Sequence, residues 1–511
     1  MAVLWQHAMD TPGWAWPNLG VIGLVILLVA QYIVFLVRSL FLSGLRDYPG
    51  PFWCRISHVP AMWHLWHGTH AYWIHRLHQR YGSVVRVTPT ELSYTDAEAW
   101  KDIYGHAHQS HQVNGKEPRF YGPVKDLDNG TPGILEAGDE DHTRMRRIFS
   151  HAFSHKAIRE QEPIFQAYTD KLISKLREVM ATDEGREFDI LAWYNYTTFD
   201  VMADLTFGES LGLLDTRVYE PWIAAITKSL EAGVIFRGMR YWPWLYRAYR
   251  SLFGRSLRDK RRVQFRYCAE RVDRRLKRDP NHTRTDMWSL VLRQKEEERL
   301  TLPEMHTNSS AFMIAGTETT ATLCTGLTYL LLRHPAKMER LVKEIREGFS
   351  GPEDMTINRM QHLRYLQACL DETLRFYPPS ATGFQRCAPP EGATICGKWV
   401  PGKTTLYVSN YACFRSKENF RDPDSFVPER FLPGSEYEAT DNRAALQPFS
   451  YGPRNCMGRH MAYVEMRMIM VKMLWNFDLE LCDGQENWLD QKVYLVFQKH
   501  PLMVRIRPRK S

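Results

Sequence analysis

One cysteine stands in a loop where its sulfur could act as a metal ligand. Residues 449–459 read Phe-Ser-Tyr-Gly-Pro-Arg-Asn-Cys-Met-Gly-Arg, and an apolar helical pattern follows directly. A thiol at such a junction lies near unpaired backbone N–H groups and the positive end of a helix dipole, which favour the thiolate. Gly452 and Gly458 permit tight turns and the close approach of a flat partner. These features make Cys456 a candidate axial ligand of an iron porphyrin.

The residues around the cysteine support this interpretation. Arg454 could pair with an acidic group on the flat partner, and Phe449 could keep water away from the sulfur. A structural cysteine in a buried turn is the alternative, and for a lone cysteine it is the commoner case. Here every fixed position of the pattern Phe-x-x-Gly-x-Arg-x-Cys-x-Gly is filled. The loop therefore resembles the haem-binding signature of the cytochrome P450 family.

A second chemical motif interrupts a long apolar helical pattern at residues 308–331. It reads Ala-Gly-Thr-Glu-Thr-Thr from position 315, and its hydroxyls and acid could bind water and relay protons. An exposed polar helix face is the alternative. The hexapeptide resembles the oxygen-activation motif of the cytochrome P450 family. The resemblance implies that Thr319 steadies the bound oxygen, that Glu318 helps deliver protons and that Gly316 leaves room for dioxygen.

Glu372 and Arg375 are three residues apart on one helical face, which suits a charge-assisted pair. Such pairs are common on protein surfaces, but this one lies between the oxygen motif and the cysteine loop. It resembles the ExxR motif of the family. The resemblance implies a third partner, Arg430, and a structural role in holding the cysteine loop.

Three further residues are candidates for binding the carboxylates of the cofactor. His142 and Arg146 lie four apart and share a helical face. Family members usually carry a Trp and an Arg there, both in contact with the haem propionates, so His142 replaces the Trp. Arg386 matches a further propionate position. The departure at His142 concerns haem anchoring and leaves the expected reaction unchanged.

The length and cysteine usage indicate one large domain in a reducing compartment. The chain has 511 residues, and neither a low-complexity linker nor an internal repeat divides it. Its nine cysteines are scattered without a C-x-x-C pair, which is neither a disulfide framework nor a zinc signature.

The N-terminal region predicts a membrane anchor. Residues 21–37 are almost entirely apolar and, with their flanks, reach the ~20 residues that a spanning helix needs. No Lys or Arg precedes them, which argues against a cleaved signal peptide. Basic residues follow them, which places the rest of the chain in the cytosol. The expected organisation is a luminal N-terminus (1–18), an anchor (19–42), a Pro/Gly hinge (43–52) and a catalytic domain (53–511), single-pass in the endoplasmic reticulum membrane.

The basic residues are concentrated in one segment. Residues 237–278 hold fifteen Lys and Arg against three Asp and Glu, beside aromatic residues that include Trp242 and Trp244. This composition suits a surface resting on anionic lipid. A solvated charged helix is the alternative. No recognition motif for nucleic acid accompanies the segment, and no nucleic-acid partner is expected.

The resemblance, carried by four motifs in the family's order, implies a mainly α fold with a small β-rich region. It also implies haem b as cofactor and insertion of one oxygen atom from O2 into a C–H or C=C bond of an apolar small molecule. About fifty residues follow Cys456, too few for a flavin domain. The expected electron donor is NADPH–cytochrome P450 reductase, with cytochrome b5 as a further candidate.

The segments 199–210 and 447–452 resemble the fungal microsomal members that oxidise secondary metabolites. A polyketide, terpenoid or alkaloid intermediate would fit as substrate. Two other functions compete with this one: an O2-independent thiolate-haem isomerase or dehydratase, and a non-enzymatic haem sensor. The intact Glu318 and Thr319 argue against the first, and the lack of an effector module argues against the second.

Overall fold

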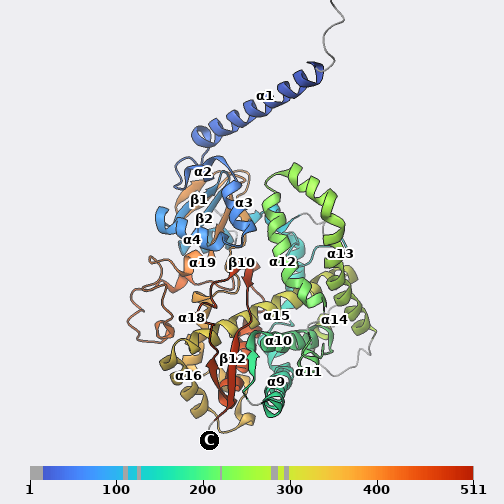
Figure 1. Ribbon diagram of the computed structural model, residues 1–511, viewed down its shortest axis with the longest axis vertical. Helices are drawn as coiled ribbons and strands as arrows, with labels where there is room; N and C mark the ends of the chain where they lie inside the picture. Colours follow the sequence, from blue (N-terminus) through green and yellow to red (C-terminus); the bar gives the residue numbers. More distant parts are fainter. Residues whose placement is uncertain are drawn as a thin grey trace, which may run out of the picture.

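Helices dominate the chain, as the helical spacing of its apolar residues predicts. The computed structural model describes residues 15–106, 113–122, 128–183, 185–218, 221–277, 286–292 and 299–509. Helix α15 crosses the centre of the body, β1 and β2 lie near the end from which α1 projects, and β12 lies towards the opposite end (Figure 1).

The helices are α1 (Ala15–Val37), α2 (Phe52–Ile56), α3 (Val59–Trp66), α4 (His70–Tyr81), α5 (Glu98–Tyr104), α6 (Pro118–Tyr121), α7 (Asp139–Ser150), α8 (His155–Glu160), α9 (Glu162–Thr182), α10 (Ile190–Phe207), α11 (Leu213–Thr216), α12 (Pro221–Met239), α13 (Pro243–Leu276), α14 (Met287–Leu292), α15 (Leu302–Leu332), α16 (Pro335–Gly348), α17 (Ile357–Met360), α18 (Arg364–Phe376), α19 (Asn410–Phe414) and α20 (Arg459–Asn476). The strands are β1 (Val84–Thr88), β2 (Glu91–Tyr94), β3 (Gly115–Lys116), β4 (Glu187–Asp189), β5 (Arg386–Cys387), β6 (Ala393–Ile395), β7 (Lys398–Val400), β8 (Thr405–Val408), β9 (Phe477–Leu481), β10 (Lys492–Tyr494), β11 (Val496–Gln498) and β12 (Met503–Pro508).

The strands form small sheets that join distant parts of the chain. The largest has the order β1-β2-β8-β5-β3, with β2 and β8 parallel and the other pairs antiparallel. A second sheet has the order β4-β12-β9, and β10–β11 and β6–β7 form two-stranded sheets. The five-stranded sheet therefore brings β3, which precedes the long helices, beside β5 and β8, which follow them.

Helix α15 is the central element, and its start is specified locally. Thr301 caps the helix through a capping box: its hydroxyl accepts from Glu304 N, and its own N–H donates to the Glu304 carboxylate at 2.8 Å. Helix α15 packs against α10, whose residues are almost all buried. This contact lies in the main hydrophobic core, beneath the polar motif at 315–320.

The segment 199–210 comprises the buried last turns of α10 and the three residues that follow the helix. The fully buried Asp200 carboxylate accepts hydrogen bonds from Leu213 N at 3.1 Å, Leu214 N at 3.0 Å and the Ser210 hydroxyl at 3.1 Å. Gly208 ends α10 at φ 66°, in the left-handed region that glycine tolerates. This segment thus has a structural function.

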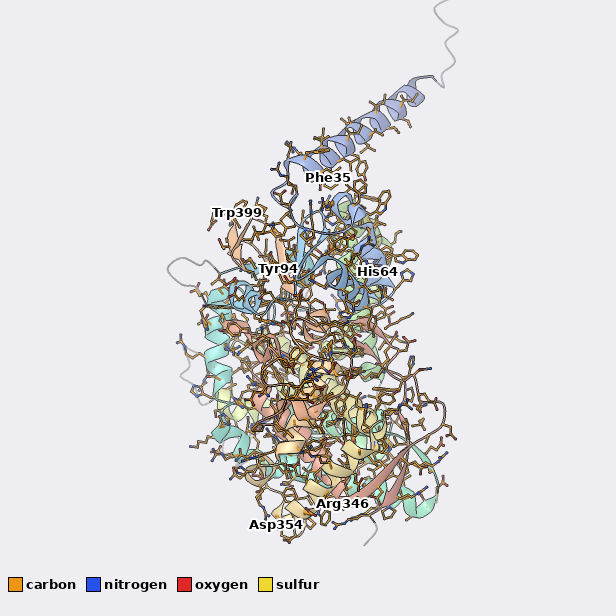
Figure 2. The ribbon with its side chains drawn as sticks, turned by 90° about the vertical axis from the view of Figure 1, so that its left-hand side faces the viewer. Phe35, His64, Tyr94, Arg346, Asp354 and Trp399 are labelled. Carbon is orange, nitrogen blue, oxygen red and sulfur yellow. The ribbon has the colours of Figure 1, made fainter. Side chains whose placement is uncertain are left out.

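The predicted apolar span is a helical segment that stands apart from the body. The span Val21–Leu42 has a mean hydropathy of 2.5 over its 18-residue apolar window, and none of that window is buried. Figure 2 shows the side chains of α1, including Phe35, projecting free of the protein body. The segment is long and apolar enough to cross a membrane, which fits an anchor. The N-terminal section, residues 1–14, lies outside the described residues.

The predicted hinge at 43–52 is fastened to the body. Leu45 and Tyr48 are buried, and the Tyr48 hydroxyl donates to Trp399 O at 3.0 Å. The fully buried Arg86 on β1 donates to the main-chain oxygens of Ser39 and Leu45, each at 3.3 Å. The joint between anchor and body is therefore packed on β1 and stiffer than a free linker.

The basic segment at 237–278 is only partly a surface. Arg237 and Arg275 are buried, and Arg275 pairs with Asp286 at 2.6 Å. Arg274 pairs with Glu209 at 3.0 Å. Trp244 is 68% exposed at the start of α13. Several cations that the sequence assigns to a lipid surface thus stabilise the fold, while Trp244 keeps the predicted exposure. Residue 278 and the side chains of 253–261 lie outside the described part.

Candidate functional site

The cysteine loop is held by backbone contacts before α20 begins. Cys456 N donates to Phe449 O at 2.8 Å, closing the loop on itself. Gly452 has φ 74°, and a Cβ there would lie 1.9 Å from Tyr104 O. Gly452 is therefore required by its packing against the end of α5. A Cβ on Gly458 would lie in ordinary van der Waals contact with Cys456 Sγ and a Phe153 ring atom, each at 3.9 Å, so Gly458 lies close to the sulfur.

Phe449 lies on the α20 side of this loop. Its ring centroid is 5.4 Å from that of Tyr463, and the Arg459 guanidinium lies 5.7 Å from its centroid. Phe449 therefore connects the loop that carries Cys456 to the first turns of α20.

Cys456 is exposed, in contrast to most cysteines of the described chain. Burial of the sulfur among protein atoms raises the pKa of the thiol, while the Gly458 N–H and the charges of Arg146 and Arg459 lower it. The sequence predicted only the lowering influences. In the haem-free protein, desolvation of the thiol has the largest single effect on its pKa. A bound metal cation would instead favour the thiolate.

The motif on α15 presents Ala315 and Thr319 on one side. Ala315 is exposed although most of α15 is buried, and the Thr319 hydroxyl donates to Ala315 O at 2.7 Å. Gly316 faces elsewhere: a Cβ there would lie 2.5 Å from Met202 Sδ. Its lack of a side chain therefore allows α15 to approach α10. The sequence predicts that Gly316 leaves room for dioxygen. On the exposed side of α15, however, the small residue is Ala315.

Glu318 is held by a lysine from the C-terminal segment. Lys499 Nζ makes an ion pair with Glu318 Oε1 and donates to Thr322 Oγ1 at 2.8 Å. The Lys499 and Glu318 side chains are 4% and 10% exposed. The sequence did not identify Lys499.

Basic side chains gather where the sequence predicted contacts to carboxylates. They come from four elements and comprise Lys116 on β3, His142 and Arg146 on α7, Arg386 on β5 and Arg454 in the cysteine loop. Arg146 Nη1 donates to Asn455 O at 2.7 Å, which joins α7 to the cysteine loop. Arg454 Nη2 donates to Ala137 O at 3.1 Å and pairs with Asp139 at 2.7 Å.

Burial and neighbouring positive charges make protonation of the basic groups in this cluster less favourable. Burial, with Arg454 and Arg386, lowers the pKa of Lys116 to about 7. Burial, with Arg454, Lys116 and Arg146, lowers the pKa of His142 to about 4. A cluster with these properties favours an anionic ligand, because added negative charge would offset the repulsion.

These residues fit a haem. An iron porphyrin has carboxylates that the cation cluster would bind and an iron that needs an axial ligand, which Cys456 would supply. Phe153, beside Gly458, lies 5.8 Å from Phe312 on α15, ring centroid to centroid, so the loop and α15 flank a common region. Within the described residues, no group of three or more His, Cys, Asp and Glu could hold a metal ion.

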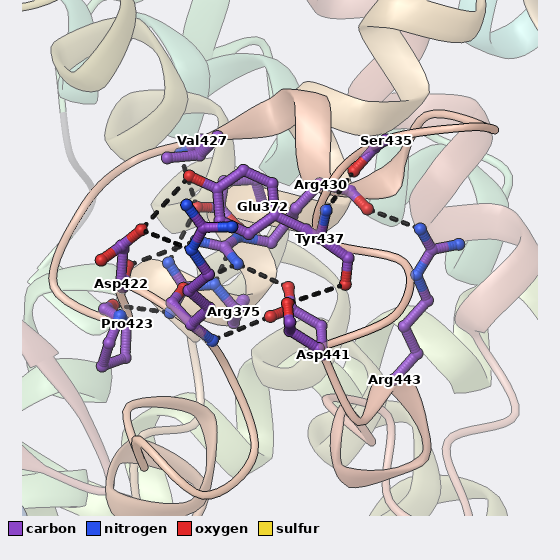
Figure 3. A network of polar contacts seen from close by, with 12 residues as sticks. Glu372, Arg375, Asp422, Pro423, Val427, Arg430, Ser435, Tyr437, Asp441 and Arg443 are labelled. Atoms are coloured by element: carbon purple, nitrogen blue, oxygen red, sulfur yellow. Dashed lines mark hydrogen bonds and ion pairs between the residues drawn. The ribbon is translucent and has the colours of Figure 1, made fainter.

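Glu372, Arg375 and Arg430 meet in one fully buried network (Figure 3). Glu372 Oε2 accepts from Arg375 Nε at 2.7 Å and lies 3.1 Å from Arg430 Nε. Arg375 also donates to the main-chain oxygens of Phe414, Pro423 and Ser425 at 2.7 to 2.9 Å. The network fixes the segment that leads to the cysteine loop. Glu372 pairs with both buried guanidiniums, and the buried Asp441 carboxylate pairs with Arg430 at 2.5 Å, so two carboxylates balance the two cations inside the fold.

Comparison with known proteins agrees with this site. The family model for cytochrome P450 matches residues 49–506. The cytochrome P450 monooxygenase efuB of Hormonema carpetanum is 45% identical over 494 residues, 96% of this chain and 97% of the relative. FUM2 of Gibberella moniliformis is 42% identical over 91% of this chain and 98% of the relative, and astA of Talaromyces wortmannii is 40% identical over 96% and 97%.

The chain belongs to the cytochrome P450 family, and its relatives are fungal monooxygenases. Membership confirms the predicted mainly α fold with small sheets and the predicted oxidoreductase class. It also implies a haem-thiolate cofactor and the general need for a redox partner.

Proposed function

We propose that the chain is a monooxygenase that holds haem b through Cys456. The observation that carries the proposal is the exposed residue Cys456 beside a cluster of basic side chains that disfavour each other's charge. Arg146, Arg386 and Arg454, with His142 and Lys116, would bind the propionates. When bound, the haem would supply the iron at which O2 is activated, and donation from the thiolate would favour O–O cleavage.

The residues of α15 would control water and protons at the reacting face. The Thr319 hydroxyl, placed beside the exposed Ala315, would hydrogen-bond to the oxygen species and to water. Glu318, next in the chain, would pass protons from solvent. Ala315, in place of the predicted Gly316, would leave room for dioxygen.

The overall reaction takes electrons from NADPH through a separate reductase. One atom of O2 enters the substrate and the other leaves as water, with protons supplied through Thr319 and Glu318. NADPH–cytochrome P450 reductase is the proposed donor, and cytochrome b5 is a further candidate. The apolar segment Val21–Leu42 would anchor the protein in the endoplasmic reticulum membrane with residues 53–511 in the cytosol.

We assign the protein to the tailoring of a secondary metabolite, as its similarity to fungal monooxygenases over almost the whole chain supports. The substrate would be an apolar polyketide, terpenoid or alkaloid intermediate, and the product its hydroxylated or epoxidised derivative. An isomerase or dehydratase would need neither O2 nor a reductase.

The test is to incubate membranes containing the protein and a fungal reductase with the metabolite extract of the source, NADPH and isotopically labelled O2. A product that carries one labelled oxygen atom per oxidation is expected. Product formation without O2 or NADPH would instead identify an isomerase or dehydratase. An oxygenated product that carries no label would have taken its oxygen from water and would exclude insertion from O2.

A further inference from the structure

The ion pair between Glu318 and Lys499 joins the acid of the α15 motif to a part of the chain 181 residues away. Lys499 lies between β11 and β12, and its ammonium contacts two consecutive turns of α15 through Glu318 and Thr322. The Thr322 hydroxyl also donates to Glu318 O at 2.6 Å. Glu318 is therefore fixed at both its carboxylate and its main chain.

The backbone around Lys499 is itself held in place. Trp488 Nε1 donates to His500 O at 2.9 Å, and Leu502 N donates to Asp189 Oδ1 at 3.1 Å. On the other side, the Phe497 ring stacks on Tyr377 with centroids 4.1 Å apart. Lys499 thus extends from a fastened segment, so its ammonium has a defined position.

The position of the Lys499 ammonium determines how the Glu318 side chain is held. The Glu318 carboxyl group is nearly buried, and Lys499 Nζ is in direct contact with it. An ammonium in direct contact favours the carboxylate and restricts its rotation. The pair therefore holds the Glu318 side chain in a defined position, one residue before Thr319 in α15.

We propose that Lys499 is a positioning residue for proton transfer, which acts by fixing the side chain of Glu318, the neighbour of Thr319 in the chain. The proposal rests on the proposed monooxygenase function. It adds Lys499, from the C-terminal segment, to the residues of the α15 motif that take part in proton transfer. Lys499 itself need not contact substrate or cofactor.

The test compares the variants Lys499→Met, Lys499→Arg, Glu318→Gln and the double variant Glu318→Gln/Lys499→Met. Each is assayed with reductase, NADPH and O2 without added substrate, after its ferrous–CO spectrum has been recorded. The readouts are the rate of O2 reduction to water, the hydrogen peroxide formed per NADPH and the solvent isotope effect on NADPH oxidation.

Lys499→Met is expected to slow O2 reduction to water on the order of 10²-fold and to raise the peroxide yield, with its ferrous–CO band unchanged. Lys499→Arg should restore most of the rate. Because Lys499 acts through Glu318, the double variant should match Glu318→Gln in rate, peroxide yield and isotope effect. If Lys499→Met fails to fold, the double variant, which removes both charges, still gives this comparison with Glu318→Gln.

Two results would overturn the inference. One is a folded Lys499→Met protein with wild-type rate, peroxide yield and isotope effect. The other is a double variant whose losses are the product of the two single losses, since Lys499 would then act independently of Glu318. A wild-type protein without the thiolate-type ferrous–CO band or NADPH-dependent O2 use would refute the proposed function itself, and this inference with it.

Discussion

Lys116 and Arg386 are register partners on the antiparallel strands β3 and β5, so two cationic side chains lie directly opposite each other. Like charges in this arrangement destabilise a sheet by ~0.2–1 kcal/mol per pair. The same two side chains would bind a carboxylate that lies between them. The repulsion that destabilises the haem-free protein would therefore favour binding of an anionic cofactor.

Lys116→Met is therefore expected to have opposite effects with and without haem. The haem-free variant should be more stable than the haem-free wild type at neutral pH by ~0.2–1 kcal/mol. The haem-loaded variant should release haem faster to an excess of apomyoglobin. Lys343→Met, at an exposed site on α16, is the control and should change neither value. Faster unfolding of the haem-free variant with unchanged haem release would contradict the assignment.

The stability of the haem-free protein should also depend on pH through Lys116. Its folded pKa of about 7 lies below its ordinary value of 10.5, so the unfolded chain binds this proton more tightly. Stability should accordingly rise as pH increases from about 7 to about 10.5. Thermal unfolding at several pH values would measure the rise, which Lys116→Met should reduce. An equal rise in both proteins would assign it to other groups.

Thr319 and Thr325 form a matched pair on α15 because each donates its hydroxyl at 2.7 Å to the carbonyl four residues earlier. Thr325 is fully buried, whereas Thr319 lies on the exposed side with Ala315. Thr319→Val should divert reducing equivalents to peroxide and slow O2 reduction to water ~10²–10⁴-fold. Thr325→Val should leave the peroxide yield unchanged. Equal yields in the two variants would place the relay elsewhere.

Glu372→Gln should destabilise the fold by ~3–5 kcal/mol, because it leaves Arg375 buried without its carboxylate partner and Arg430 with Asp441 alone. Urea unfolding would measure the loss. The control is Glu347→Gln, which breaks an exposed pair with Lys343 at 3.9 Å and should change stability by less than ~1 kcal/mol. Similar losses in the two variants would show that the buried network is not a main source of stability.

Deleting residues 1–37 should leave the stability of the protein body unchanged, whereas deleting residues 1–45 should lower it. Deleting 1–37 takes away most of the apolar span and keeps the acceptors of Arg86 at Ser39 and Leu45. Deleting 1–45 leaves a buried guanidinium short of partners, which should cost ~1–3 kcal/mol or more. Both proteins should be released from membranes more readily than the full chain. Equal stability of the two truncated proteins would contradict the role of Arg86.

Short-range patterns predicted much of the candidate site. The cysteine loop is one continuous segment, and the ion pair of Glu372 and Arg375 arises from their spacing within one helix turn. Arg146 and His142 share a face of α7, as their spacing predicted. In each case neighbouring residues in the sequence define the geometry.

The residues that the sequence missed have distant partners. Lys116 lies against Arg386 because β3 pairs with β5, and no local pattern shows that pairing. Lys499 reaches Glu318 across the fold in the same way. Gly316 was assigned to dioxygen, although its environment is set by Met202 on another helix. Tertiary contacts of this kind determine which face of a motif meets the site.

The central claim, that Cys456 supplies the axial thiolate of a haem, is tested most directly by ferrous–CO difference spectra of the wild type, Cys456→Ser and Cys387→Ser. The wild type and Cys387→Ser should show the red-shifted band typical of thiolate ligation, and Cys456→Ser should lose that band or the haem itself. Retention of the red-shifted band by Cys456→Ser would contradict the assignment.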